Sequence, residues 1–156
     1  MEEQSVKASQ VYTTELVLPN DTNQLGNVLG GRLMHWIDIA AAIAAYRHAG
    51  RVCVTASVDE LNFHDPIKLG EIVVLQASVN RAFNSSMEVG VLVTADNARG
   101  GPPRRANNAY LTFVAIDENG KPVLVPPIVP QTDDEKRRFN EALERRQLRL
   151  ARRAKG

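Results

Sequence analysis

Asp38 is the residue of this sequence whose position most clearly suggests chemistry. It lies within residues 33–45, where nearly all of its neighbours are apolar. An unpaired carboxylate in such surroundings is destabilising by several kcal/mol, and a poorly solvated carboxylate is a stronger base. Asp38 is therefore a candidate general base or nucleophile. The alternative is a structural role, in which Asp38 is bonded to His35 or to a neighbouring chain.

A second group of residues comes just before this apolar run. Asn23, Gly26, Gly30 and Gly31 form a loop that leads directly into it. Backbone N–H groups at the start of a helix can donate to an anion or to a polarised carbonyl. The spacing is neither the dinucleotide-binding pattern nor a P-loop, because no Gly-Lys-Ser/Thr follows. The alternative is that these glycines only turn the chain and allow close packing.

The elements that must position these residues are a helix and five strands. Residues 31–48 are apolar almost all round, which predicts one buried helix that ends at Gly50. Strands are predicted at 10–18, 52–63, 71–80, 86–96 and 107–116, which are rich in Val, Leu, Ser and Thr. This order predicts an α+β fold with one curved sheet. Because one such sheet cannot cover every face of the helix, we expect an oligomer.

The length of the predicted helix separates the two candidate groups. Gly31 and Asp38 are seven residues apart, which is about 10 Å at ~1.5 Å per residue. One small reacting group cannot contact both of them in the same chain. If they act together, one chain supplies the N–H donors and its partner supplies the carboxylate. The site is then shared across a dimer.

Length and composition limit the alternatives. The 156 residues suit one domain, and the single cysteine, Cys53, excludes an internal disulfide and a Cys-x-x-Cys zinc site. The net charge of +1 and the 5% of aromatic residues argue against a nucleic-acid partner. No apolar run reaches the ~18 residues of a membrane span, and the polar N-terminus carries no signal pattern. We therefore expect a cytoplasmic protein with no membrane insertion.

Three segments are expected along the chain. Residues 1–9 are predicted to be flexible, residues 10–130 to form the single domain, and residues 131–156 to form a basic C-terminal helix or tail. Thr132 and Glu135 fit a capping box at the start of such a helix. Residues 133–156 hold nine Lys or Arg and five Asp or Glu. We expect its arginines to be solvated surface charges.

The motifs together resemble the hotdog-fold acyl-CoA thioesterases, in their acyl-CoA hydrolase branch. The family pattern is an asparagine, then Gly-x-x-x-Gly-Gly, then a hydrophobic helix that contains an acidic residue. In this sequence the pattern begins at Asn23 and ends at Asp38. The resemblance continues through residues 57–66, 68–71, 84–89 and 111–117, and so covers about 10–130. It implies a curved five- or six-stranded antiparallel sheet wrapped around one long central helix. It also implies homodimers that assemble further into hexamers, as trimers of dimers.

The resemblance implies hydrolysis of acyl-CoA to free CoA and a carboxylic acid, with no metal and no cofactor beyond the CoA of the substrate. Asp38 of one protomer matches the catalytic carboxylate, and Asn23 of the other matches its partner. The backbone N–H near Gly31 matches the oxyanion donor. Ser57, on the strand after the helix, is expected to orient the attacking water.

Coenzyme A carries phosphate groups, so cationic residues and neutral donors are expected along its entry. The candidates are Lys68, Arg81, Arg104 and Arg105, with Asn84, Ser85 and Ser86 as neutral donors. Two other functions stay open. One is a non-catalytic sensor of acyl-CoA or a nucleotide. The other is a hotdog enoyl-CoA hydratase, because His35 lies three residues before Asp38.

Overall fold

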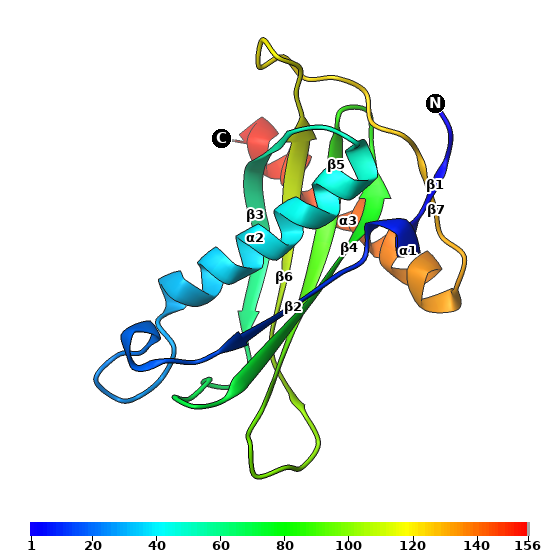
Figure 1. The fold of residues 1–156 in the computed structure, drawn as a ribbon. Helices are drawn as coiled ribbons and strands as arrows, with labels where there is room; N and C mark the ends of the chain where they lie inside the picture. Colours follow the sequence, from blue (N-terminus) through cyan, green and yellow to red (C-terminus); the bar gives the residue numbers. More distant parts are fainter. Residues whose placement is uncertain (156) are drawn as a thin grey trace.

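A five-stranded antiparallel sheet with a long helix on each face forms the body of the protein in the computed structural model, which describes residues 1–155 (Figure 1). The strands lie in the order β2 (Val11–Leu16), β4 (Ile72–Ala82), β5 (Ser86–Asp96), β6 (Arg104–Ala115) and β3 (Cys53–Phe63). The predicted α+β architecture is confirmed. Each strand begins and ends within three residues of its predicted bounds.

Helix α2 (Gly30–Ala49) lies on the inner face of the sheet. Ile37, Ala40 and Ala44 on this helix are fully buried. The small alanine side chains let the helix axis approach the apolar strand residues closely, and this contact forms the core. The helix ends at Gly50, whose φ of 70° is the left-handed conformation that glycine adopts most easily. The predicted helix is therefore confirmed at both ends to within one residue.

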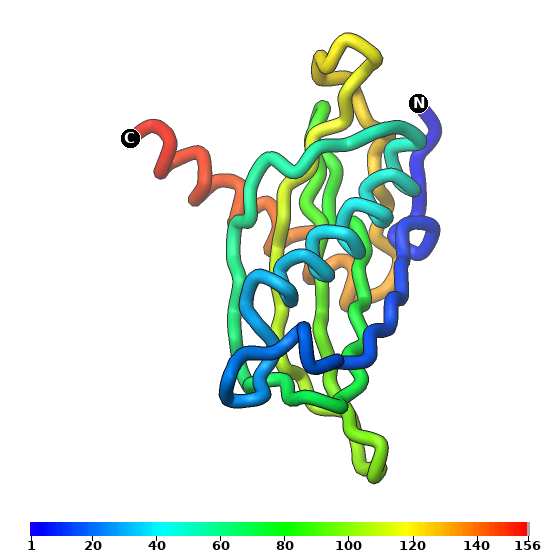
Figure 2. The backbone as a smooth tube through the Cα atoms, turned by 60° about the vertical axis from the view of Figure 1, so that its left-hand side comes forward, coloured from blue at the N-terminus to red at the C-terminus, as the bar shows by residue number. Residues whose placement is uncertain are grey.

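Helix α3 (Asp133–Lys155) covers the outer face of the sheet. Its start has the predicted capping box, because the Glu135 N–H donates to Thr132 Oγ1 at 3.1 Å and the Thr132 N–H donates to Glu135 Oε1 at 3.4 Å. The helix is more firmly packed than the solvated helix or tail expected from the sequence, because Arg145 and Arg149 form ion pairs with Glu88 and Asp59 of the sheet. Its last turns project past the β3 edge of the sheet (Figure 2).

The N-terminal residues, which the sequence predicted to be flexible, form two short elements. The strand β1 (Gln4–Ser5) pairs in parallel with β7 (Ile128–Val129), and the helical turn α1 (Val6–Ser9) follows. Ser9 is buried, and its Oγ accepts a hydrogen bond from the Val79 N–H at 2.9 Å. This differs from the expectation because the pairing partner of β1 lies more than 120 residues away in the sequence.

No helix among residues 1–155 combines the length and the apolar character that crossing a membrane requires.

Candidate active site

Asp38 lies at the rim of the helix–sheet interface, beside the edge strand β3. Its Oδ1 accepts a hydrogen bond from Thr55 Oγ1 at 2.8 Å. Asp38 is half-buried and Thr55 is exposed, so the carboxylate is accessible from the open side of β3. Asp38 therefore does not need a buried partner to be tolerated on this apolar helix, which weakens the purely structural interpretation.

The residue that contacts Asp38 is Thr55 and not the predicted Ser57. A register shift between these two residues leaves Ala56 as an extra residue in β3. Thr55 pairs with the inner-face residue Phe113, whereas Ser57 pairs with Thr112 on the outer face. In a regular strand, residues two apart share a face, and a bulge re-aims the side chains beyond it. The proposed position of Ser57 is thus corrected: its Oγ donates to Asp59 at 2.7 Å on the α3 side.

Asn23 organises the loop before α2. Its Oδ1 accepts hydrogen bonds from the N–H groups of Leu25 at 2.9 Å and Asn27 at 3.1 Å, and its own N–H donates to the Asn27 carbonyl at 2.8 Å. Gly26 completes the turn with a φ of 75°. Because both loop bonds use Oδ1, the side-chain NH₂ of this exposed residue points out of the loop as a hydrogen-bond donor.

The first turn of α2 presents open backbone donors. The N-cap residue Leu29 has no capping side chain, and the helix bonds begin with the Leu33 N–H, which donates to the Leu29 carbonyl at 3.1 Å. The preceding N–H groups, including that of Gly31, therefore have no partner within the helix. A Cβ added at Gly30 or Gly31 would have no atom within 4 Å in this chain. Close packing within the chain thus does not explain these glycines.

The start of α2 and Asp38 are not brought together within one chain. They lie two turns apart on the same helix, so the ~10 Å separation expected from the helix rise holds. Asp38 instead faces β3, an 11-residue strand at the edge of the sheet. Val54 and Val58 on this edge are exposed apolar residues. An open edge of this kind is a template for pairing with another strand.

The residues predicted to bind coenzyme A fall into two groups at opposite ends of the sheet. Ser86 is the first residue of β5, whereas Arg104 pairs with Ala95 near the last residue of β5. The two groups therefore lie at opposite ends of this strand. Ser86 and Ala95 are nine residues apart along β5, so the two groups are separated by about 30 Å. The groups are Lys68, Arg104 and Arg105 near the start of α2, and Arg81, Asn84, Ser85 and Ser86 near the β4–β5 turn.

Arg104 is already engaged by its neighbours. Its Nη2 donates to Glu71 Oε1 and to the Pro66 carbonyl, each at 2.8 Å. The hydrogen-bonded guanidinium lowers the pKa of the Glu71 carboxyl. Arg104, the first residue of β6, therefore links this strand to Glu71, which directly precedes β4. Lys68 and Arg105, by contrast, have exposed side chains in the same region.

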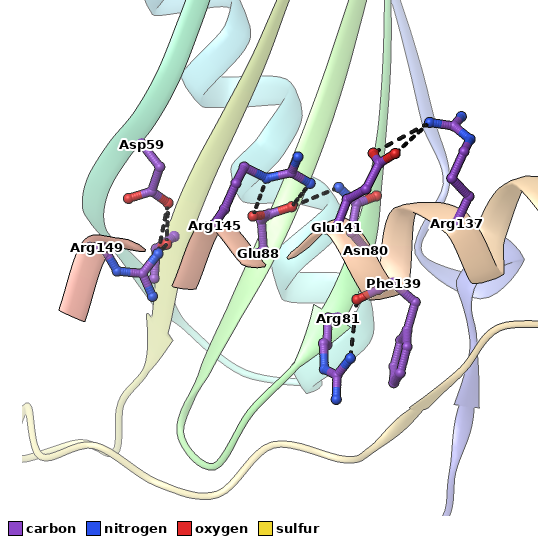
Figure 3. A network of polar contacts seen from close by, with 10 residues as sticks. Asp59, Asn80, Arg81, Glu88, Arg137, Phe139, Glu141, Arg145 and Arg149 are labelled. Carbon is purple, nitrogen blue, oxygen red and sulfur yellow. Dashed lines mark hydrogen bonds and ion pairs between the residues drawn. The ribbon is translucent and has the colours of Figure 1, made fainter. Parts of the chain in front are cut away.

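At the other end, Arg81 and Ser86 face α3. The Arg81 guanidinium lies 3.9 Å from the centre of the Phe139 ring and donates to the Phe139 carbonyl at 3.1 Å (Figure 3). Ser86 Oγ accepts from Arg146 at 3.3 Å. Both residues thus help to dock α3. Asn84 is exposed and Ser85 is half-buried beside them at the turn.

The histidines do not form a dyad with Asp38 in residues 1–155. His48 is bonded to the Pro126 carbonyl at 2.7 Å and His64 to Asn108 at 2.8 Å, while His35 is exposed and makes no hydrogen bond to Asp38 among the described contacts. The described residues also contain no group of three or more His, Cys, Asp or Glu with the geometry of a metal site.

The comparisons with known proteins agree with this architecture. Residues 25–101 match the family model described as the thioesterase superfamily. The chain is 44% identical over 139 residues to the uncharacterized acyl-CoA thioester hydrolase YkhA of Bacillus subtilis, covering 89% of this chain and 81% of that protein. It is 43% identical over 142 residues to mouse acyl-coenzyme A thioesterase 11, covering 91% of this chain. It spans only 24% of the length of that mouse protein.

The solved structures that resemble this chain are also acyl-CoA hydrolases and thioesterases. The acyl-CoA hydrolase of Staphylococcus aureus, in complex with butyryl coenzyme A and coenzyme A, matches with a TM-score of 0.93 at 42% identity, over 98% of this chain and 93% of that chain. An apo-hexameric acyl-CoA thioesterase matches with a TM-score of 0.95 at 39% identity, over 99% of each chain. The chain therefore belongs to the thioesterase superfamily, among its hotdog-fold acyl-CoA hydrolases.

Proposed function

We propose that this protein hydrolyses acyl-CoA thioesters to coenzyme A and a carboxylic acid, with Asp38 as the reacting carboxylate. The observation that carries the proposal is the hydrogen bond from Thr55 to Asp38 at the open edge of β3. It leaves the second carboxylate oxygen free for chemistry in a chain that is 42% identical to a hydrolase solved with butyryl coenzyme A.

The spacing of three residues supports this assignment. The Staphylococcus aureus hydrolase has been solved with an asparagine, an aspartate and a threonine each replaced by alanine. In that enzyme the asparagine lies 15 residues before the aspartate, and the threonine lies 17 residues after it. Asn23, Asp38 and Thr55 have the same spacing here. Thr55, and not Ser57, is therefore the hydroxyl of β3 that acts at this site, and it acts by holding Asp38.

The chemistry follows from the groups available. Thr55 holds Oδ1 of Asp38, and the other carboxylate oxygen accepts a proton from a water as that water attacks the thioester carbonyl. The tetrahedral oxyanion is stabilised by the Gly31 N–H and the Asn23 side-chain NH₂. Its collapse breaks the C–S bond, and the thiolate of coenzyme A takes up the proton from Asp38. In the alternative route Asp38 attacks the carbonyl itself, and water then hydrolyses the resulting anhydride.

A second copy of the chain completes the site. Pairing of β3 with β3 of the partner would extend the sheet and cover the exposed Val54 and Val58. The start of α2 of one copy then supplies Asn23 and Gly31 to Asp38 of the other. A related acyl-CoA thioesterase is hexameric, which supports a trimer of dimers. A relative at 42% identity is a cytosolic rat acyl-CoA thioester hydrolase, and we assign this protein to the cytoplasm on that basis.

Release of free thiol from a panel of acyl-CoA esters tests the proposal. Asp38→Asn keeps the side-chain shape but removes the base, so turnover is expected to fall on the order of 10²- to 10⁴-fold. Burial raises the pKa of the Cys53 thiol to about 11, so the folded protein itself contributes little to the thiol signal. Equal turnover by wild type and Asp38→Asn would contradict the assignment.

Two further variants test the geometry. Thr55→Val removes the hydroxyl that holds Asp38, while Thr55→Ser retains it and serves as the matched control. Mixing Asn23→Ala chains with Asp38→Ala chains should restore one intact site in each mixed dimer. Verified mixed dimers that stay inactive would exclude the shared site.

A further inference from the structure

The edge strand β3 contains two bulges close together. Its pairing with β6 shifts twice, and Ala56 and Asp59 are the residues that are left without a partner in β6. An extra residue of this kind interrupts the hydrogen-bond ladder and bends its strand. Within residues 1–155, β6 is the only strand that pairs with β3. The ladder on one side of β3 is therefore not enough to fix where the bulges lie.

The second bulge is anchored by side chains on the outer face of the sheet. Asp59 Oδ2 accepts hydrogen bonds from Arg149 of α3 at 3.1 Å and from Thr112 of β6 at 2.5 Å (Figure 3). The side chains of Arg149 and Asp59 are 14% and 8% exposed, so their attraction is screened little by water. A charged pair with several hydrogen bonds holds the extra residue in one position.

A hydrogen bond connects this anchor to the first bulge. Ser57 Oγ donates to Asp59 Oδ1 at 2.7 Å, and Ser57 directly follows Ala56. Because of the bulge at Ala56, Thr55 faces α2 while Ser57 faces α3. In a regular strand these two side chains would share a face. The bond from Thr55 to Asp38 on the inner face thus depends on a bulge that is held from the outer face.

Helix α3 lies outside residues 25–101, which match the thioesterase family model. We infer that Arg149 of this helix is a positioning residue for thioester hydrolysis. Through Asp59 it fixes the bulges of β3, and these keep Thr55 against the carboxylate of Asp38. Arg149 acts from the opposite face of the sheet and does not contact the reacting groups. The inference rests on the proposed role of Asp38, and it connects α3 to the active site.

Thiol release by the folded Arg149→Gln protein, measured over a range of acyl-CoA concentrations, tests the inference. The kcat is expected to fall by about ten- to hundredfold, as it does when catalytic groups are slightly misplaced. The KM should change little, because the contact positions the reacting carboxylate and does not bind substrate. Nη1 of Arg149 makes both of its hydrogen bonds in this cluster. Arg149→Lys keeps one charged nitrogen and should therefore recover part of the activity.

Arg145→Gln is the matched control. Arg145 lies one turn earlier on α3 and pairs with Glu88 of β5 at 2.8 Å, so it docks the same helix through a different strand. Its kcat should stay close to that of the wild type. Asp59→Asn breaks the Arg149 pair from the strand side and leaves the sequence of α3 unchanged. It should lower kcat as Arg149→Gln does, and it replaces that variant if Arg149→Gln does not fold.

Two further measurements separate positioning from a general loss of stability. In a Thr55→Val background, Arg149→Gln should cause no further fall in kcat, because the bond that it positions is already absent. Crystal structures should show the bond between Thr55 and Asp38 lost in Arg149→Gln and retained in Arg145→Gln.

The outcomes distinguish this inference from the proposed function. A retained bond in Arg149→Gln, or equal losses of kcat in the Arg145 and Arg149 variants, would overturn the inference. If Asp38→Asn is as active as the wild type, loss of the bond in Arg149→Gln would still support the positioning of Thr55. Only the proposed role of Asp38 would then be contradicted.

Discussion

The two faces of the sheet are each covered by one helix, but the two contacts depend on different physics. On the inner face, Ala40 and Ala44 of α2 pack against apolar strand residues with no exposed surface. On the outer face, Arg145 of α3 donates to Glu88 at 2.8 and 2.9 Å, and Arg149 donates to Asp59 at 3.1 Å (Figure 3).

The difference explains why the sequence describes α2 better than α3. Apolar contact is not directional, so the pattern of small and large residues is enough to indicate which helix is buried. Buried ion pairs are directional, and taking their charges out of water opposes their attraction. They stabilise one position of α3 on the sheet, but their arginines look like solvated charges in the sequence. The prediction of surface arginines was wrong for Arg145 and Arg149, whose side chains are 16% and 14% exposed.

The largest loss of stability is expected when the outer-face contact is broken. Glu88→Gln leaves the Arg145 guanidinium without its charge partner, and removal of one member of a buried pair destabilises by about 3–5 kcal/mol. Urea unfolding measures this loss. The double variant Glu88→Gln with Arg145→Met removes both charges while residue 88 keeps an amide oxygen that can accept from Asn80 Nδ2, so it should recover most of the free energy of unfolding. Equal losses in the single and double variants would mean that packing, and not the ion pair, holds α3.

The next largest loss of stability is expected when the inner-face contact is disturbed. Ala44→Leu adds volume to a site with no free surface, and overpacking of this kind destabilises by about 1–3 kcal/mol. The same exchange at Ala151, which is exposed on α3, serves as the control and should change stability by less than about 0.5 kcal/mol. Thermal unfolding of both variants tests whether α2 depends on close approach to the sheet.

The pH dependence of stability gives a further test of the inner face, because a titratable group is buried there at the end of α2. Burial lowers the pKa of His48, against the opposing effect of its hydrogen bond to the Pro126 carbonyl. Above pH ~6.5 His48 is neutral in both states. Below that pH the unfolded chain takes up a proton that the folded chain does not, so stability falls by at most about 1.4 kcal/mol per pH unit.

Replacement of this histidine tests the assignment. His48→Gln keeps a donor for the Pro126 carbonyl but cannot titrate, so its free energy of unfolding should fall less steeply between pH 6.5 and 5. Identical slopes for the variant and the wild type would show that another group causes the pH dependence.

The smallest effect concerns an ion pair on the exposed side of α3. Arg137 and Glu141 lie 3.4 Å apart, and their side chains are 57% and 37% exposed. Exposed pairs of this spacing contribute about 0.3–0.5 kcal/mol, so Glu141→Gln should change urea unfolding by no more than this. A loss close to that of Glu88→Gln would remove the distinction between buried and exposed pairs on this helix.

The sequence by itself determined the elements that depend on local signals. The run of alanines, the glycine at 50 and the pair Thr132 and Glu135 predicted where both long helices lie, because helix periodicity and capping act over a few residues. The unusual positions of Asn23 and Asp38 were visible in the same way, since a polar residue interrupts an otherwise regular pattern.

The tertiary structure alone decided what depends on the alignment of distant segments. The bulge at Ala56 places Thr55 and not Ser57 against Asp38, and this shift appears only when β3 pairs with β6. Burial of Arg145 depends on Glu88, 57 residues away. The pairing of β1 with β7 depends likewise on a distant strand. A change of one residue in strand register exchanges the two faces, and no local pattern in the sequence reports that register.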